Sequence, residues 1–163
     1  MIPLQRAGYR VAFRLLQLRW RLLRPRLEAV KCVITDGDRV LLVRHTYGPR
    51  AWDLPGGASR RGEAPAETAR REMAEELGLP PLPWVPLGEL RGRMFGRHDL
   101  VHVFGVEVDD PPLRVDPVEL ATAAWFHRDR LPLWRNRLFE SIITAGLLAP
   151  AGRQNPSPHR PAK

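Results

Sequence analysis

One helix with a glycine-rich approach, set between runs of strand-forming residues, limits the folds open to this chain more than any other feature. Residues 65–77 are predicted to form that helix, because Pro65 suits its first turn and Gly78 is placed to end it. The tripeptide 55–57 directly upstream is Pro-Gly-Gly, which breaks regular structure. Strand-like runs lie both before and after the helix, so the predicted class is α/β, with a mixed β-sheet between helices.

The strand-like runs are rich in apolar and β-branched residues and are separated by turn signals. They fall at 29–35, 39–45, 52–54, 87–94, 100–108 and 121–127, and a closing helix is predicted at 134–148. Asp36-Gly37-Asp38, between the first two runs, is typical of a hairpin connection. Four prolines between residues 80 and 86 predict an extended linker after the central helix.

The net charge of +8 is concentrated at the two ends of the 163-residue chain. Residues 1–31 carry a net charge of +7 and residues 150–163 carry +3, so the middle of the chain is slightly acidic. We therefore expect neither a uniform basic groove nor a nucleic-acid partner. The predicted organisation is a basic segment at 1–27, one folded domain at 28–149 and a Pro-rich, disordered tail at 150–163.

The N-terminal segment is predicted to form an amphipathic helix over residues 3–24, with a wide apolar face and arginines opposite. Such a face is expected to pack on the domain or on a partner subunit in a dimer. Peripheral attachment to an anionic membrane surface is the alternative. A cleaved targeting segment is less favoured, because arginines interrupt the apolar stretch and no small-residue cleavage pattern is present.

The cellular compartment is suggested by the cysteine content. Cys32 is the only cysteine, so an intrachain disulfide is excluded and a reducing compartment is expected. No uncharged apolar stretch of about 18 residues occurs, so no membrane-spanning helix is predicted. We expect a cytoplasmic protein.

Three glutamates on the central helix carry the chemistry. Glu72, Glu75 and Glu76 share one helix face, where their charges repel one another and should raise their pKa values. A hard divalent cation removes this repulsion, and Mg²⁺ takes oxygen ligands and is often shared with substrate phosphates. The face therefore indicates a Mg²⁺ or Mn²⁺ site for diphosphate chemistry, and the alternative is a solvated acidic surface. Arg71 lies beside the glutamates and can pair with Glu67 one turn earlier.

The residues around these glutamates follow a fixed spacing. Gly57 is followed by five residues and Glu63, and then by seven residues and the run Arg71-Glu72-Met73-Ala74-Glu75-Glu76-Leu77-Gly78-Leu79. This stretch resembles the Nudix box at every defined position. Residues 28–149 as a whole are similar to Nudix hydrolases, whereas the N-terminal helix and the tail lie outside the resemblance.

The resemblance implies an α/β/α sandwich and Mg²⁺-dependent hydrolysis of a nucleoside diphosphate linked to another group. The metal ligands that it implies are Glu72, Glu75 and Glu76, helped by the Gly56 carbonyl. It also implies that Glu63 and Arg71 orient the ligands.

The carboxylate that accepts the proton of the attacking water varies within the family. Glu75 and Glu72 are candidates inside the box. Glu119 is the candidate outside it, because it precedes the last strand, where a loop can face the site. Asp116 competes with Glu119, and an ordinary loop acid or an auxiliary ligand is the alternative role for Glu119.

Five further residues are candidates for binding the substrate. Arg44, at the end of the 39–45 run, is expected to contact phosphate, because related proteins often place an arginine there. Tyr47 and Arg97, in two predicted loops, are candidates for lining the mouth of the site. Trp52 and Phe95 are candidates for stacking on a nucleobase, with core packing as the alternative for Trp52.

The group attached to the nucleoside diphosphate is not readable from the sequence. A nucleotide sugar, a dinucleotide and a nucleoside triphosphate stay open as substrates, and RNA ends are less favoured. The alternative function is a non-hydrolytic Nudix module that binds a nucleotide or a membrane. The intact glutamate set argues against this alternative, because a pure binder does not need every carboxylate.

Overall fold

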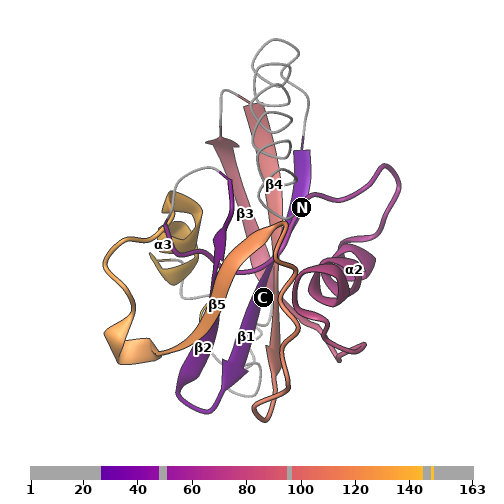
Figure 1. Cartoon of the computed structure of the whole chain (residues 1–163). Helices are drawn as coiled ribbons and strands as arrows, with labels where there is room; N and C mark the ends of the chain where they lie inside the picture. The colour runs from indigo at the N-terminus through magenta and orange to yellow at the C-terminus, as the bar shows by residue number, and fades with distance from the viewer. Residues whose placement is uncertain (1–26, 48–50, 95–96, 145–147, 149–163) are drawn as a thin grey trace, which may run out of the picture.

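The computed structural model describes residues 27–47, 51–94, 97–144 and 148 (Figure 1). The predicted N-terminal helix, the C-terminal tail and Phe95 lie outside these residues. The side chains of Leu27 and of residues 92–98, Arg97 among them, also lie outside the description.

The described part of the chain alternates strands and helices as the sequence predicts. In chain order the elements are β1 (Leu27–Asp36), β2 (Arg39–His45), α2 (Pro65–Leu77), β3 (Val85–Met94), β4 (Arg97–Glu107), β5 (Leu120–His127), the short 3-10 helix η1 (Arg128–Arg130) and α3 (Arg137–Thr144). The bounds of α2 are those predicted from Pro65 and Gly78.

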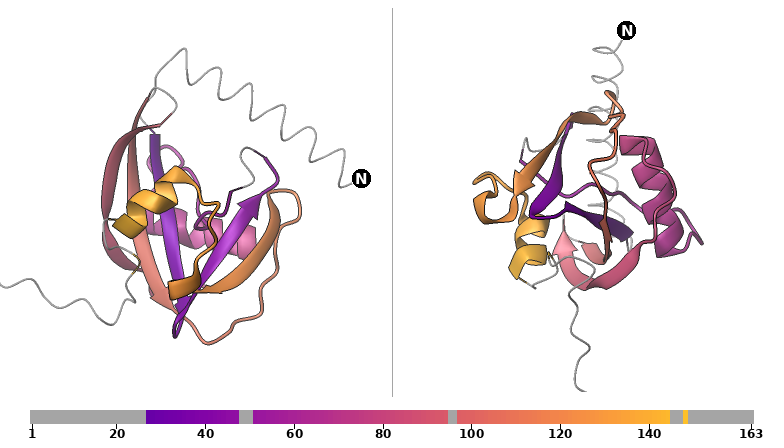
Figure 2. Two further views of the ribbon diagram at one scale, coloured as in Figure 1. Left: turned by 90° about the vertical axis from the view of Figure 1, so that its left-hand side faces the viewer. Right: turned by 90° about the horizontal axis from the view of Figure 1, so that it is seen from below.

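The strands form one mixed sheet in the order β3-β4-β1-β2-β5. β1 and β4 run parallel, and the other neighbours are antiparallel. Figure 2 shows α2 on one side of the sheet and α3 on the other, which confirms the predicted α/β/α sandwich.

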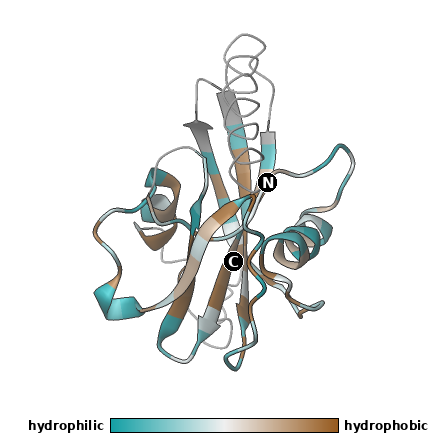
Figure 3. Cartoon of the chain, in the orientation of Figure 1, coloured by the Kyte–Doolittle hydropathy of each residue, from teal (hydrophilic) through white to brown (hydrophobic). Residues whose placement is uncertain are grey.

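Alternation along β1 divides the core into two layers. Cys32 and Ile34 pack with Met73 of α2, whereas Val33 packs with Phe139 of α3. Figure 3 shows hydrophobic residues along the strands and mostly hydrophilic residues on the outer side of α2. Among the described residues, no helix is long and apolar enough to cross a bilayer.

The glycine-rich approach to α2 lies in the middle of the sheet. β1 and β2 pair next to their hairpin turn and then diverge, and residues 51–58 fill the space between them. Val43 of β2 exchanges two backbone hydrogen bonds with Asp53, at 2.9 and 3.0 Å. On the other side, the Val30 amide donates to the Gly57 carbonyl at 2.9 Å. The turn that precedes the box is therefore fixed from both sides.

Several elements differ from the sequence prediction, two of them for a clear structural reason. Trp52 and Asp53 form isolated bridges, and residues 52–54 are not a separate strand. The closing helix begins at Arg137, later than the predicted Trp134. The reason is a contact with a distant segment: the Trp52 amide donates to the Trp134 carbonyl, and the Asn136 amide donates to the Trp52 carbonyl, both at 2.9 Å. These bonds hold the backbone before α3 in an extended form.

Candidate active site

The start and end of α2 are set by local contacts. The Ala64 amide donates to the Glu67 carboxylate at 3.2 Å, so Glu67 caps the helix. Gly78 has a φ of +66°, the left-handed conformation that favours glycine, and its amide donates to the Ala74 carbonyl at 3.1 Å. The predicted pairing of Glu67 with Arg71 is not formed, because Arg71 turns toward other carboxylates.

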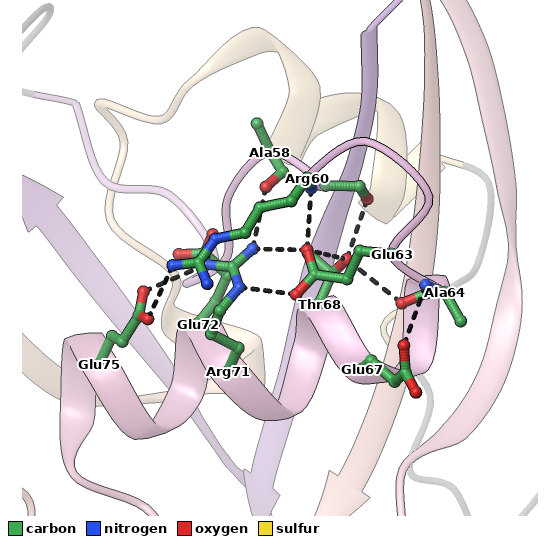
Figure 4. A network of polar contacts seen from close by, with 10 residues as sticks. Ala58, Arg60, Glu63, Ala64, Glu67, Thr68, Arg71, Glu72 and Glu75 are labelled. Carbon is green, nitrogen blue, oxygen red and sulfur yellow. Dashed lines mark hydrogen bonds and ion pairs between the residues drawn. The ribbon is translucent and has the colours of Figure 1, made fainter.

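The main partner of Arg71 is Glu63, in the loop before α2 (Figure 4). Arg71 Nε donates to Glu63 Oε1 at 2.7 Å, and Nη2 donates to Oε2 at 2.8 Å. The Arg60 amide and the Thr68 hydroxyl also donate to Glu63 Oε2, at 2.8 and 3.0 Å. Hydrogen bonds from Arg71 and these other donors lower the pKa of Glu63 to about 2. The contact with Glu63 in turn raises the pKa of Arg71, so both groups stay charged at neutral pH.

Arg71 also connects this loop to the glutamates of α2. Its Nη1 donates to Glu72 Oε1 at 2.7 Å and to Glu75 Oε2 at 3.1 Å. Its Nη2 donates to the Ala58 carbonyl at 3.1 Å. A second arginine, Arg60, donates from Nη2 to Glu75 Oε1 at 3.2 Å. Both oxygens of Glu75 therefore have an arginine partner.

Glu76 is almost completely buried, with 2% of its surface exposed. Its Oε2 accepts a hydrogen bond from the Gly56 amide at 3.0 Å. Burial raises the pKa of Glu76 to about 8, and the charges of Glu72 and Glu119 act in the same direction. Gly56 is required at this point, because its φ is +133° and a Cβ would lie 2.4 Å from the Val30 carbonyl oxygen.

Glu72 lies directly against the other glycine of the turn. A Cβ on Gly57 would be 2.5 Å from the carboxyl carbon of Glu72, so a larger residue there would displace the Glu72 carboxylate from this position. Burial raises the pKa of Glu72 in spite of its contact with Arg71, and the charges of Glu119 and Glu75 also raise it. Two of the predicted carboxylates, those of Glu72 and Glu76, therefore lie against the glycine turn.

Glu119 and its competitor Asp116 have different surroundings. The Glu119 carbonyl accepts a hydrogen bond from the Thr46 amide at 2.8 Å, and the Thr46 hydroxyl donates to the Val118 carbonyl at 2.6 Å. These contacts hold the loop before β5 against the end of β2. Asp116 Oδ1 accepts from the Val118 amide at 2.9 Å and shapes the turn. Of these two carboxylates, Glu119 but not Asp116 is among the charges that raise the pKa values of Glu72 and Glu76.

Arg44 and Trp52 form one unit. The Arg44 guanidinium lies 4.4 Å from the centre of the Trp52 ring, and the Phe126 ring packs in a T-shaped arrangement with Trp52, with ring centroids 4.6 Å apart. Trp52 is 8% exposed, so it packs in the core and supports Arg44, with little surface open to a base. Tyr47 is half-buried, and its ring lies 5.1 Å from that of His45.

The predicted loop between β3 and β4 is shorter than expected. Arg97 is already part of β4 and pairs with Met94 across the hairpin. The Arg97 side chain and Phe95 lie outside the described residues, so their substrate contacts stay predictions.

The donor set of the site suits a hard divalent cation. Carboxylate oxygens from Glu72, Glu75, Glu76 and Glu119 are the ligands that Mg²⁺ and Mn²⁺ prefer, and burial, with a smaller contribution from like charges, raises the pKa values of Glu72 and Glu76. Within the described ranges, no three acidic, histidine or cysteine side chains are already spaced as ligands of one ion. Arg71 and Arg60 bind carboxylate oxygens of Glu72 and Glu75, so a cation would have to replace these contacts.

Sequence reasoning missed three residues of this network. Arg60 and Thr68 stand at variable positions of the box, and no spacing rule singles them out. Thr46 follows Arg44 and His45 in the sequence, but its contact with the 118–119 backbone depends on the pairing of β2 with β5. These contacts become visible only when distant segments are placed together.

A sheet between two helices, with a glycine turn leading into a glutamate-lined helix, defines the class of the domain. The family model described as NUDIX domain matches residues 25–145, which is most of the chain. The chain therefore belongs to the Nudix family.

Two curated relatives and one solved structure illustrate which proteins this chain is similar to. An ADP-ribose pyrophosphatase from Mycobacterium tuberculosis is 34% identical over 113 residues, which cover 65% of this chain and 54% of the relative. The NAD-capped RNA hydrolase NudC from Stutzerimonas stutzeri is 30% identical over 136 residues, which cover 81% of this chain and 49% of the relative. The chain thus spans about half the length of these curated relatives. A solved MutT NUDIX hydrolase from Burkholderia pseudomallei matches with a TM-score of 0.66 at 25% identity, over 74% of this chain and 97% of that structure.

Proposed function

We propose that this chain is a metal-dependent pyrophosphohydrolase that cleaves the diphosphate bond of a nucleoside diphosphate linked to another group. The placement of Glu72 and Glu76 against the Gly56-Gly57 turn carries this proposal, together with the charges of Glu75 and Glu119 that act on them. A solvated acidic surface would leave its glutamates exposed, whereas Glu72 and Glu76 are 8% and 2% exposed. Relatives named as pyrophosphatases support the same reaction type.

The proposed metal ligands are Glu72, Glu75 and Glu76, with the Gly56 carbonyl beside them. When bound, a Mg²⁺ or Mn²⁺ ion would neutralise the diphosphate charge and lower the pKa of a water molecule. Glu63 fixes the guanidinium of Arg71, and Arg71 in turn fixes Glu72 against the glycine turn. This arrangement orients a ligand oxygen before the substrate arrives.

We infer that Glu119 is the base that accepts the proton of the attacking water. Glu72 is packed against Gly57 and bound by Arg71, which suits a ligand better than a base. Glu119 lies on a loop held by Thr46, and its charge is felt at the buried glutamates. Water attacks phosphorus, its proton passes to the carboxylate, and the bond to the bridging oxygen breaks. Arg44, supported by Trp52, is proposed to bind a phosphate oxygen.

The proposed substrates are small nucleotide derivatives. ADP-ribose pyrophosphatase is the name of one relative, and a structure 25% identical to this chain is described as a UDP-X diphosphatase. Other relatives are named for action on NAD-capped RNA or on RNA. The slightly acidic charge of residues 32–149 favours the small molecules over RNA for this chain.

The test is a hydrolysis screen with Mg²⁺ and identification of the products. The panel contains ADP-ribose, UDP-sugars, dinucleotides, nucleoside triphosphates and capped RNA. We expect Glu76→Gln to abolish turnover while the fold is kept, because glutamine can still accept from the Gly56 amide. Glu107→Gln, an exposed change on β4, is the matched control and should keep wild-type turnover. Unchanged turnover in Glu76→Gln would exclude the proposed metal site.

A further inference from the structure

Glu75 differs from the other two glutamates of its face. Its side chain is 51% exposed, whereas that of Glu72 is 11% exposed and Glu76 is buried. Arg60 Nη2 lies 3.2 Å from Glu75 Oε1, and Arg71 Nη1 lies 3.1 Å from Oε2 (Figure 4). This proposed ligand is therefore held by two guanidinium groups from different segments.

The two arginines are not held equally. The Arg71 side chain is 16% exposed and also bonds Glu63, Glu72 and the Ala58 carbonyl, so its position is fixed by the loop. The Arg60 side chain is 67% exposed, and within the described residues its guanidinium has Glu75 as its one partner. The contact of Arg60 with the Glu63 carboxylate is made by the Arg60 backbone amide and does not use the Arg60 side chain. The Arg60 side chain can therefore leave Glu75 without loosening the loop.

We propose that Arg60 is an exchangeable counter-ion of Glu75, which a divalent cation displaces and which the phosphate groups of the substrate then bind. This inference rests on the proposed function, because it takes Glu75 as a cation ligand. An exposed ion pair contributes little stability, so a divalent cation coordinated by several carboxylates outcompetes it. A released guanidinium beside the cation then meets phosphate oxygens, to which its planar donors are well suited.

A neighbouring residue provides a matched control. Arg61 is also exposed, carries the same charge and has no hydrogen bond or ion pair in the described structure. Arg60→Ala and Arg61→Ala therefore change the net charge equally, and the difference between them isolates the contact with Glu75. Circular dichroism and thermal unfolding of both full-length variants check that the fold is kept.

The first measurement is calorimetric titration of the full-length chain with Mn²⁺ in the absence of nucleotide. Arg60→Ala is expected to bind Mn²⁺ about two- to fivefold more tightly than Arg61→Ala, the range expected when an exposed ion pair no longer competes. High salt should narrow this difference, because it screens the Arg60–Glu75 pair. Equal Mn²⁺ affinities of the two variants would overturn the proposal.

The second measurement is binding of imidodiphosphate, a non-hydrolysable diphosphate, at saturating Mn²⁺. Here Arg60→Ala is expected to bind about tenfold more weakly than Arg61→Ala, because it lacks a charge-assisted hydrogen bond to phosphate. Opposite effects of one substitution on the two affinities are not expected from a purely structural role. Equal imidodiphosphate affinities would also overturn the proposal. If the wild-type chain hydrolyses nucleotides while the two variants bind alike, this inference fails and the proposed function stands.

Discussion

Arg71 and Glu63 form a bidentate ion pair, with Nε–Oε1 and Nη2–Oε2 distances of 2.7 and 2.8 Å. Glu63 belongs to the loop before α2, and Arg71 lies within the helix. The geometry leaves Arg71 Nη1 directed at Glu72 and Glu75. The pair therefore couples the position of the loop to the orientation of the proposed metal ligands.

This coupling predicts that Arg71→Lys lowers kcat about 10- to 100-fold, the usual effect of losing a residue that orients metal ligands. A lysine ammonium cannot form the two parallel bonds to Glu63 and still reach Glu72. Steady-state kinetics on the preferred nucleotide measure the effect. Arg70→Lys, on the exposed side of α2, is the control and should leave kcat unchanged. Wild-type kcat in Arg71→Lys would show that the pair does not orient the site.

Glu76 predicts a pH-dependent stability of the metal-free chain. Burial raises its pKa to about 8 in the folded state, from 4.5 in the unfolded chain. The folded state then binds more protons, so the contribution of Glu76 to stability is fully present below pH 4.5 and is lost as the pH rises through 8. In excess EDTA, Glu76→Gln should unfold with a free energy about 2–3 kcal/mol above wild type at pH 7. Urea unfolding at pH 5 and pH 7 measures this, and an equal difference at both pH values would contradict it.

Lys31 forms a buried ion pair that supports the glycine turn. Its Nζ lies 2.8 Å from Asp53 Oδ2 and donates to the Leu54 carbonyl at 2.7 Å. We expect Lys31→Met to lower the free energy of unfolding by about 3–5 kcal/mol, because it leaves a buried carboxylate without its counter-ion. The double variant Lys31→Met with Asp53→Asn should be at least about 1 kcal/mol more stable than the sum of the two single losses predicts.

Urea unfolding of the single and double variants measures this coupling. Arg39→Met is the control, since it breaks an exposed pair with Asp36 and should cost less than about 1 kcal/mol. A Lys31→Met chain as stable as Arg39→Met would show that the buried pair does not hold the turn.

His45 predicts loss of stability in acid. Burial lowers its pKa to about 3, with Lys31 contributing, and its buried Nδ1 has no hydrogen-bond partner within the described ranges. The unfolded chain, with an ordinary histidine pKa of 6.5, binds the proton more readily, so stability is lost as the pH falls from 6.5 toward 3. Between pH 7 and pH 5, the free energy of unfolding of His45→Gln should fall by about 1–2 kcal/mol less than that of wild type. The same comparison with His127→Gln, an exposed histidine, should show no recovery.

The central helix and the face of its glutamates were predictable because their signals are local. Pro65 and Gly78 set the bounds of α2 through backbone geometry that each residue carries with it. The shared face of Glu72, Glu75 and Glu76 follows from helical periodicity alone. The spacing from Gly57 to Leu79 was therefore enough to indicate the family and the proposed metal ligands.

Tertiary structure decided the features that join distant segments. Trp52 delays the start of α3 by bonding to Trp134, and Thr46 holds the backbone of Glu119 against the end of β2. Neither contact has a sequence signal, because each depends on where the sheet brings two backbones together. The pairing of Glu75 with Arg60 is of the same kind: a variable loop position gains a role only through the fold of the loop onto the helix. Local sequence determines which groups a segment carries, and packing determines which of those groups meet.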